Sequence, residues 1–181
     1  MSNRVHPKTA IGYPAKFETR EGDDTLGLVP SLLALRSGDK PPIFNTKWHL
    51  FLFAATFGFV RGGPVPNSEE PKTKKTIEWQ IFTRNSVDDV FRAIALAHTQ
   101  DIKILAPARL AEVLDIVERC AHRGLDELQH IWLKPGDPFE EILQEIYGVY
   151  SNPVEYGRSA TDTQQQIMAS LPISLGRKLS D

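Results

Sequence analysis

The chain has 181 residues, of which 41% are hydrophobic and 24% charged, and its formal net charge is -2. This composition is typical of a soluble globular protein, and a single cysteine, Cys120, excludes an internal disulfide framework and a cysteine-based zinc site. No segment is polybasic, which argues against strong sequence-independent binding of nucleic acid through bulk charge. No apolar run reaches the ~20 residues that span a bilayer, and residues 1–20 lack a signal-peptide core. We therefore expect a cytoplasmic protein without a membrane partner.

The first part of the chain predicts an unstructured arm followed by a strongly apolar helix. Residues 1–24 are polar, rich in turn residues and without periodicity, so we expect a disordered N-terminal arm. The apolar residues within 25–36 are compatible with a short helix after Pro30. Residues 47–60 are apolar on every face and are followed by two glycines and a proline, which predicts a helix capped by Asn45 or Thr46. A helix of this kind lies at the centre of a core or in an oligomer interface.

Residues 76–82 alternate between polar and apolar side chains at strand spacing. Because a single strand cannot form a sheet, we expect an extended segment that packs Trp79 and Phe82 onto the helices.

Further helices are predicted at residues 86–99, 107–124, 125–132 and 137–148, with capping boxes at the first and last of these. Their predicted ends include Gly124 and Gly148. The composition after Tyr150 predicts a largely disordered tail over residues 151–181. The predicted fold class is therefore all-α, with four to five helices around the 47–60 helix in a domain of residues 25–150 and flexible ends.

The sequence offers few residues for catalysis or cofactor binding. The five histidines lack the spacing of a helical metal site, and His98 and His122 are expected near final helical turns, where a cation complements the helix dipole. Cys120 lies on the apolar stripe of its helix, so we expect a buried, unreactive thiol. No phosphate-binding loop or nucleophile elbow is present. We assign no catalytic, cofactor-binding or metal-binding residue.

One charged feature could contact phosphates. Five cations flank the loop after the 47–60 helix: Arg61, Lys72, Lys74, Lys75 and Arg84. Such a cluster can bind a DNA backbone, whereas the acidic pair Glu69-Glu70 favours an ordinary solvated loop.

Several stretches of the chain resemble a known family. They are WHLFLFAATFGF at residues 48–59, RGG at 61–63, IEWQIF at 77–82, AIALAHT at 93–99 and LDIVERCAHRGL at 114–125. Over about residues 44–132 the chain resembles the small Dnd-system-associated proteins of the DNA phosphorothioation-associated protein 4 type. These accompany bacterial systems that mark DNA with sulfur and restrict unmarked DNA. Residues 47–82 also faintly resemble the small tetrameric subunit of the sulfur-modification machinery, which is associated with DNA binding.

The resemblance implies genomic company and assigns no catalytic residue. We expect a non-enzymatic accessory subunit of a phage-defence system linked to DNA phosphorothioation. It would bind a protein partner from the same system, and homo-oligomers are an additional expectation. Two alternatives stay open: a DNA-binding module that uses the basic loop at residues 61–84, and a small metal-dependent nuclease with dispersed acids.

Overall fold

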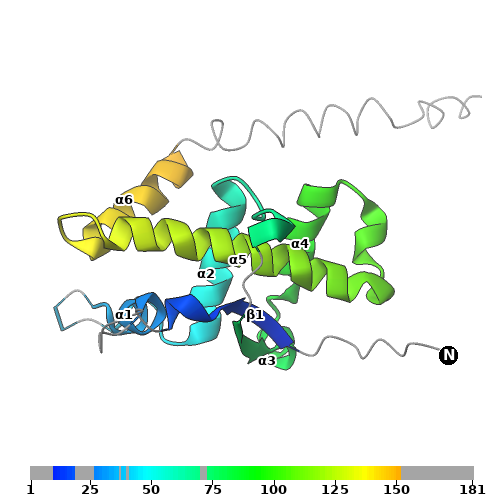
Figure 1. Ribbon diagram of the computed structural model, residues 1–181, viewed down its shortest axis with the longest axis horizontal. Coiled ribbons are helices and arrows are strands. Elements are labelled where there is room, and N and C mark those ends of the chain that lie inside the picture. Colours follow the sequence, from blue (N-terminus) through cyan, green and yellow to red (C-terminus); the bar gives the residue numbers. More distant parts are fainter. Residues whose placement is uncertain (1–9, 19–26, 37, 40, 70–72, 152–181) are drawn as a thin grey trace, which may run out of the picture. The chain divides into compact units, whose positions relative to one another are not determined.

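The computed structural model describes residues 10–18, 27–36, 38–39, 41–69 and 73–151, and the described part is mainly helical (Figure 1). Its α-helices are α1 (Leu28–Ala34), α2 (Lys47–Val60), α3 (Trp79–Arg84), α4 (Asp88–Thr99), α5 (Leu110–Trp132) and α6 (Pro138–Ser151). Its strands are β1 (Ala10–Pro14) and β2 (Lys74–Glu78), and its 3-10 turns are η1 (Ala15–Phe17), η2 (Asn67–Glu69), η3 (Ile102–Leu105) and η4 (Pro107–Arg109). The chain divides into two units, residues 1–144 and 145–181. Among the described helices, none combines the length and apolarity needed to cross a membrane.

A two-stranded antiparallel sheet is the main departure from the predicted all-α fold. In this sheet Ala10 of β1 lies opposite Glu78 of β2, and Gly12 lies opposite Thr76. The prediction of a disordered arm over residues 1–24 is therefore wrong for residues 10–18, where Ile11 and Phe17 are fully buried. The partner strand lies about 60 residues away in sequence, and local periodicity cannot indicate such a pairing. The predicted tail at 151–181 lies outside the described residues, apart from Ser151 at the end of α6.

Helix α2 forms where the sequence predicts it. Its N-cap is Thr46, whose hydroxyl accepts a hydrogen bond from the His49 amide at 3.4 Å. At the other end, the amide of Gly63 donates to the carbonyls of Gly58 and Phe59, and Gly63 adopts a φ of 77°. This is the left-handed conformation that glycine adopts at low energetic cost.

Helices α2 and α5 cross at very close range, and Figure 1 shows α2 passing behind α5. A Cβ atom placed on Gly124 would lie 1.9 Å from the carbonyl oxygen of Ala54, and one on Gly58 would lie 2.0 Å from that of Cys120. Gly124 therefore does not end a helix, as the sequence predicted, but allows two backbones to touch. The predicted helices at 107–124 and 125–132 are one continuous helix, preceded by η4.

The segment from Trp79 to Phe82 is helical, so the prediction of an extended conformation there is wrong. Only residues 74–78 are extended, and α3 starts directly after them. Trp79 and Phe82 are three residues apart and share a helix face. As predicted, both are buried, in an aromatic cluster with Phe51 of α2 and Phe91 of α4. A helix of one and a half turns is too short to show helical periodicity in its sequence.

Two other helix boundaries differ from the prediction. Ser86 has a φ of 55° and no capping role, because the N-cap of α4 is Val87 without a side-chain hydrogen bond. At α6 the predicted cap is confirmed, since the carboxylate of Asp137 accepts a hydrogen bond from the Phe139 amide at 2.9 Å. The helix then runs through Gly148 rather than ending there.

Candidate functional site

The five cations predicted to contact phosphates do not form one cluster on one element. Lys74 and Lys75 lie on β2, Arg84 lies in the last turn of α3, and Arg61 is the C-cap of α2. Lys72 lies outside the described residues.

The surroundings of these cations differ as well. The guanidinium of Arg61 lies over the ring of Phe57, 5.2 Å from its centroid. The guanidinium of Arg84 donates to the side-chain oxygen of Gln80 at 3.3 Å on an exposed face. The side chain of Lys75 is exposed. Lys75 and Arg84 are thus the described members that present exposed charge.

Lys74 instead forms an ion pair with a buried carboxylate, that of Glu118. Glu118 of α5 is 4% exposed; one of its oxygens accepts from the Lys74 ammonium at 2.8 Å and the other from the Gly12 amide at 2.7 Å. A Cβ on Gly12 would lie 3.1 Å from the Lys74 side chain, so the glycine leaves room for the lysine stem to pass. Glu118 therefore binds both strands of the sheet to α5, and its charge is balanced within the fold.

The neighbouring imidazole on α5 is also buried. His122 is 6% exposed, and its Nε2 lies 3.3 Å from a carboxylate oxygen of Asp126. Its Nδ1 has no hydrogen-bond partner among the described residues. Burial lowers the pKa of His122, although Asp126 opposes this, so the neutral ring is favoured. The expectation that His122 lies near a helix end is wrong because α5 continues for ten more residues.

The burial of Glu118 and His122 and their contacts with the sheet and Asp126 were not predicted from the sequence. Glu118 and His122 are one turn apart and occupy the same face of α5. Each follows an apolar residue and precedes an arginine, so the sequence carries no clear signal for their burial. Among the described residues, no group of three or more His, Cys, Asp or Glu side chains is placed to hold a metal ion. Cys120 is fully buried, as predicted, and burial raises the pKa of its thiol to about 12.

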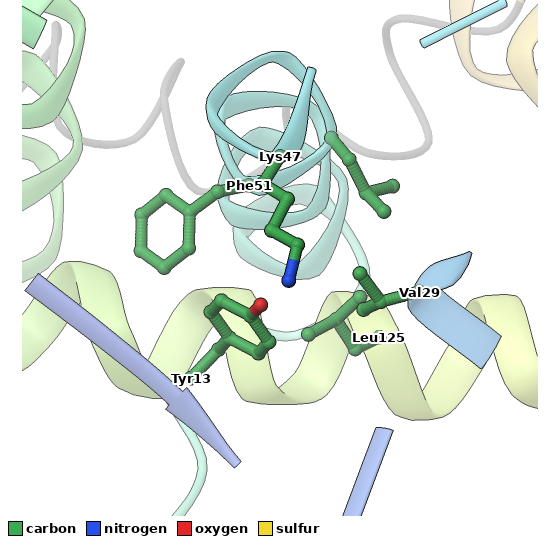
Figure 2. A pocket seen from close by; sticks show the side chains of 6 residues that line it. Tyr13, Val29, Lys47, Phe51 and Leu125 are labelled. Carbon is green, nitrogen blue, oxygen red and sulfur yellow. The ribbon is translucent and has the colours of Figure 1, made fainter. Parts of the chain in front are cut away.

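A small pocket opens where β1, α1, α2 and α5 meet (Figure 2). Figure 2 shows the ammonium of Lys47 reaching from α2 toward the ring of Tyr13 on β1, with Val29 and Leu125 alongside. The hydroxyl of Tyr13 and the Lys47 ammonium both donate to one oxygen of Glu18. The polar groups at this pocket therefore already satisfy one another.

This network shifts the titration of its members. Burial raises the pKa of Tyr13, as does its bond to Glu18. Burial alone would raise the pKa of Glu18, but the hydrogen bonds from Lys47 and Tyr13 outweigh it and lower the pKa. The carboxylate of Glu18 therefore stays ionised and holds the end of the β1 segment against α2.

Helix α2 has one packed face and one apolar face that is only partly covered. The packed face contains Leu50, Phe51, Ala54, Ala55, Phe57 and Gly58, which are all buried. Burial was predicted for four of them, Phe51, Ala54, Ala55 and Phe57, and is confirmed. At 100° per residue, the opposite side contains His49 in the first turn and then Leu52, Phe53, Thr56, Phe59 and Val60. We call the five residues from Leu52 to Val60 the outer face of α2. All five are partly exposed, and none is charged.

The outer face of α2 is fixed by its own aromatic contacts. The ring of Phe53 stacks on that of Phe57 at 5.5 Å and lies 5.2 Å from the ring of Phe44. The hydroxyl of Thr56, at the centre of the face, donates to the carbonyls of Leu52 and Phe53. Because the Thr56 hydroxyl is already hydrogen-bonded within its own helix, it adds no free polar group to the face.

The comparison with protein families identifies the chain. The family model described as DNA sulphur modification system-associated protein 4 matches residues 19–164. The chain belongs to this family. No curated protein and no solved structure matches the chain.

The region that matches the family contains the outer face of α2, the α2–α5 crossing and both Glu118 and His122. Strand β1 lies outside the match, although it pairs with β2 inside it. As its description states, the sulphur modification system-associated protein 4 family is associated with DNA sulphur modification, which confirms the predicted resemblance.

Proposed function

We propose that this protein is a non-enzymatic accessory subunit of a bacterial DNA phosphorothioation-linked modification and restriction system. It acts by binding another protein of that system through the outer face of α2. Membership of the sulphur modification system-associated protein 4 family supports the biological setting. The apolar outer face of α2 supports the mode of action.

The outer face of α2 is the observation that carries the proposal. A helix that packs on one side ordinarily places polar or charged residues on its other side. Here, apart from His49 in the first turn, the other side consists of Leu52, Phe53, Phe59 and Val60 around Thr56, all partly exposed. Contiguous exposed apolar residues mark protein-binding surfaces. Their aromatic members are held in place by the stacked rings of Phe53 and Phe57, which reduces the entropy lost on binding.

The buried ionisable groups support an architectural rather than a catalytic role. Glu118 binds the Gly12 amide and the Lys74 ammonium, and Glu18 binds Tyr13 and Lys47. These contacts join segments that are far apart in sequence, and each charge is balanced within the fold.

The proposal is tested by placing a charge in the outer face of α2. Thr56→Glu puts a carboxylate at its centre, where burial against an apolar partner would be costly. The matched control is Thr99→Glu, because Thr99 is also partly buried in a helix and donates to a carbonyl of its own helix, that of Ala95, at 2.8 Å. Each full chain is tagged and co-expressed with the other proteins of its modification system. The wild type and Thr99→Glu should retain a partner that Thr56→Glu loses. Equal retention by both variants, or metal-dependent cleavage of DNA by the purified chain, would contradict the proposal.

Contact with DNA is the second candidate function, and the exposure of Lys75 and Arg84 favours it. If both residues contact phosphates, a plot of the logarithm of the binding constant against the logarithm of salt concentration should have a slope of about -0.9 for each contact. Replacing both residues by alanine should then make the slope less steep by about 1.8. Lys103→Ala, at an exposed site on η3, should not change the slope. A salt titration on duplex DNA distinguishes this function from protein binding.

A further inference from the structure

The two edges of the β1–β2 sheet differ in how their backbone groups are satisfied. Gly12 lies directly opposite Thr76, and its amide points away from β2 because it donates to Glu118. In an antiparallel pair of strands, two opposite residues either form backbone hydrogen bonds with each other, or the amides and carbonyls of both point away from the other strand. The amide and carbonyl of Thr76 therefore point to the far side of β2. The Ala15 amide, which donates to the Thr73 carbonyl at 3.0 Å, agrees with this alternation.

Among the described residues, no second strand pairs with the far edge of β2. Helix α5 lies against the outer edge of β1, where the Glu118 carboxylate accepts a hydrogen bond from the Gly12 amide. On β2 the side chains of Lys75, Thr76 and Glu78 are exposed, and no bond to the backbone of Thr76 across this edge is present among the described residues. An exposed strand edge of this kind is a template for pairing with another chain.

We propose that β2 pairs with β2 of a second copy of this chain, antiparallel and around a two-fold axis at Thr76. The Thr76 amide of each copy donates to the carbonyl of the partner's Thr76. The two sheets then form one sheet of four strands, in the order β1, β2, the partner's β2 and the partner's β1. A two-stranded sheet has only marginal stability by itself, and a sheet of four strands is more stable.

The sequence of β2 is complementary to itself in this register. The strand reads KKTIE, so Lys74 lies opposite the partner's Glu78, and Glu78 lies opposite the partner's Lys74. Lys75 lies opposite the partner's Ile77. Opposite charges and paired threonines facing each other across strands are favourable, whereas like charges are not. The Lys74 ammonium itself bonds to Glu118 on the β1 side of the sheet, so it attracts the partner's Glu78 across the strand without a second direct bond.

A pairing centred on Lys75 is less favourable than the pairing centred on Thr76. An axis at Lys75 would place two lysines opposite each other, and it would also align residues whose backbone groups already face β1. Lysines on an edge ordinarily prevent pairing. In the Thr76 register, neither lysine of β2 faces another lysine. This surface is separate from the outer face of α2 and does not depend on the proposed function.

Disulfide trapping tests the proposal directly. In a hydrogen-bonded antiparallel pair the Cα atoms lie about 5.5 Å apart, which is within the range of a disulfide. Thr76→Cys should therefore form a covalent dimer on mild oxidation of the full chain. Thr83→Cys on α3 is the matched control, because Thr83 is equally an exposed threonine but lies away from the axis. The native Cys120 does not interfere because it is fully buried and its pKa is raised to about 12.

Sedimentation gives a second, non-covalent readout. The wild-type chain should associate with increasing concentration, and Thr76→Lys should dissociate the dimer because two lysines then meet at the axis, whereas Thr83→Lys should not. Melting curves of the dilute monomers check that both lysine variants fold. Equal covalent dimer from the two cysteine variants, or a wild-type chain that stays monomeric at its highest soluble concentration, would overturn the proposal.

Discussion

Because α2 and α5 cross at such close range, we predict that adding a single methyl group at Gly124 destabilises the fold. In an ordinary helix, Gly→Ala stabilises the fold by about 1 kcal/mol. At Gly124 the added Cβ would lie 1.9 Å from the Ala54 carbonyl oxygen and 2.9 Å from its Cα. Since ordinary non-bonded contacts lie at about 3.5 Å, the two helices would have to separate by ~1.5 Å. The obstructing atoms are backbone, so no side chain can rotate away.

The expected result for Gly124→Ala is a loss of stability despite the better helix propensity. Overpacking of a core costs about 1–3 kcal/mol and occasionally more, and a backbone-to-backbone clash should exceed that range. Gly148→Ala is the matched control, because Gly148 also lies inside a helix but its added Cβ would meet nothing within 4 Å. Urea denaturation measures both free energies of unfolding. A Gly124→Ala chain as stable as the wild type would refute the close crossing.

Three further outcomes follow from the buried core and its charges. Glu118→Gln should lower the free energy of unfolding by about 2–3 kcal/mol, less than for a fully buried pair because Lys74 is 26% exposed. Asp115→Asn, which breaks a more exposed pair on the same helix, should cost less than ~1 kcal/mol in the same urea titration; equal losses would contradict the role of Glu118. Phe51→Ala should cost about 3–5 kcal/mol, and an unchanged melting temperature would refute its place in the core. Because the pKa of His122 is lowered in the folded state, the unfolded chain binds its proton more readily, so stability should fall as pH drops below about 6.5. His122→Gln should reduce that dependence on pH, and an unchanged pH profile would contradict it.

The sequence predicted those features that depend on local pattern. The bounds of α2 and its cap, which the sequence narrows to Asn45 or Thr46 and the structure places at Thr46, follow from composition and spacing within one segment. The cap of α6 at Asp137 was predicted for the same reason. Both rest on interactions between residues a few positions apart, and such interactions are visible in any short window of sequence.

The features that the sequence did not predict depend on contacts between distant segments. Strand β1 is stabilised by a partner more than 60 residues away, so its own short alternation at Ile11 and Tyr13 was not sufficient. Gly124 has the residue type of a helix end, but the backbone of Ala54 determines its role. Glu118 has the residue type of a solvated face, yet the Gly12 amide and Lys74 satisfy it inside the fold.

The predicted cation cluster shows the same limit for function. Arg61, Lys74 and Arg84 are close in sequence, but the chain turns from α2 through β2 into α3 between them. Closeness in sequence therefore did not produce one common surface. The outer face of α2 follows from the apolar sequence of the helix, but only the structure shows which side is left partly exposed.

The central claim is that the outer face of α2 binds a protein of the DNA sulphur modification system. Its most direct test is a calorimetric titration of the purified chain with the partner that co-purifies with it, comparing the wild type with Thr56→Glu and Thr99→Glu. We predict that Thr56→Glu weakens binding at least tenfold, or about 1.4 kcal/mol, while Thr99→Glu leaves it unchanged. An affinity of Thr56→Glu equal to that of the wild type would contradict the claim.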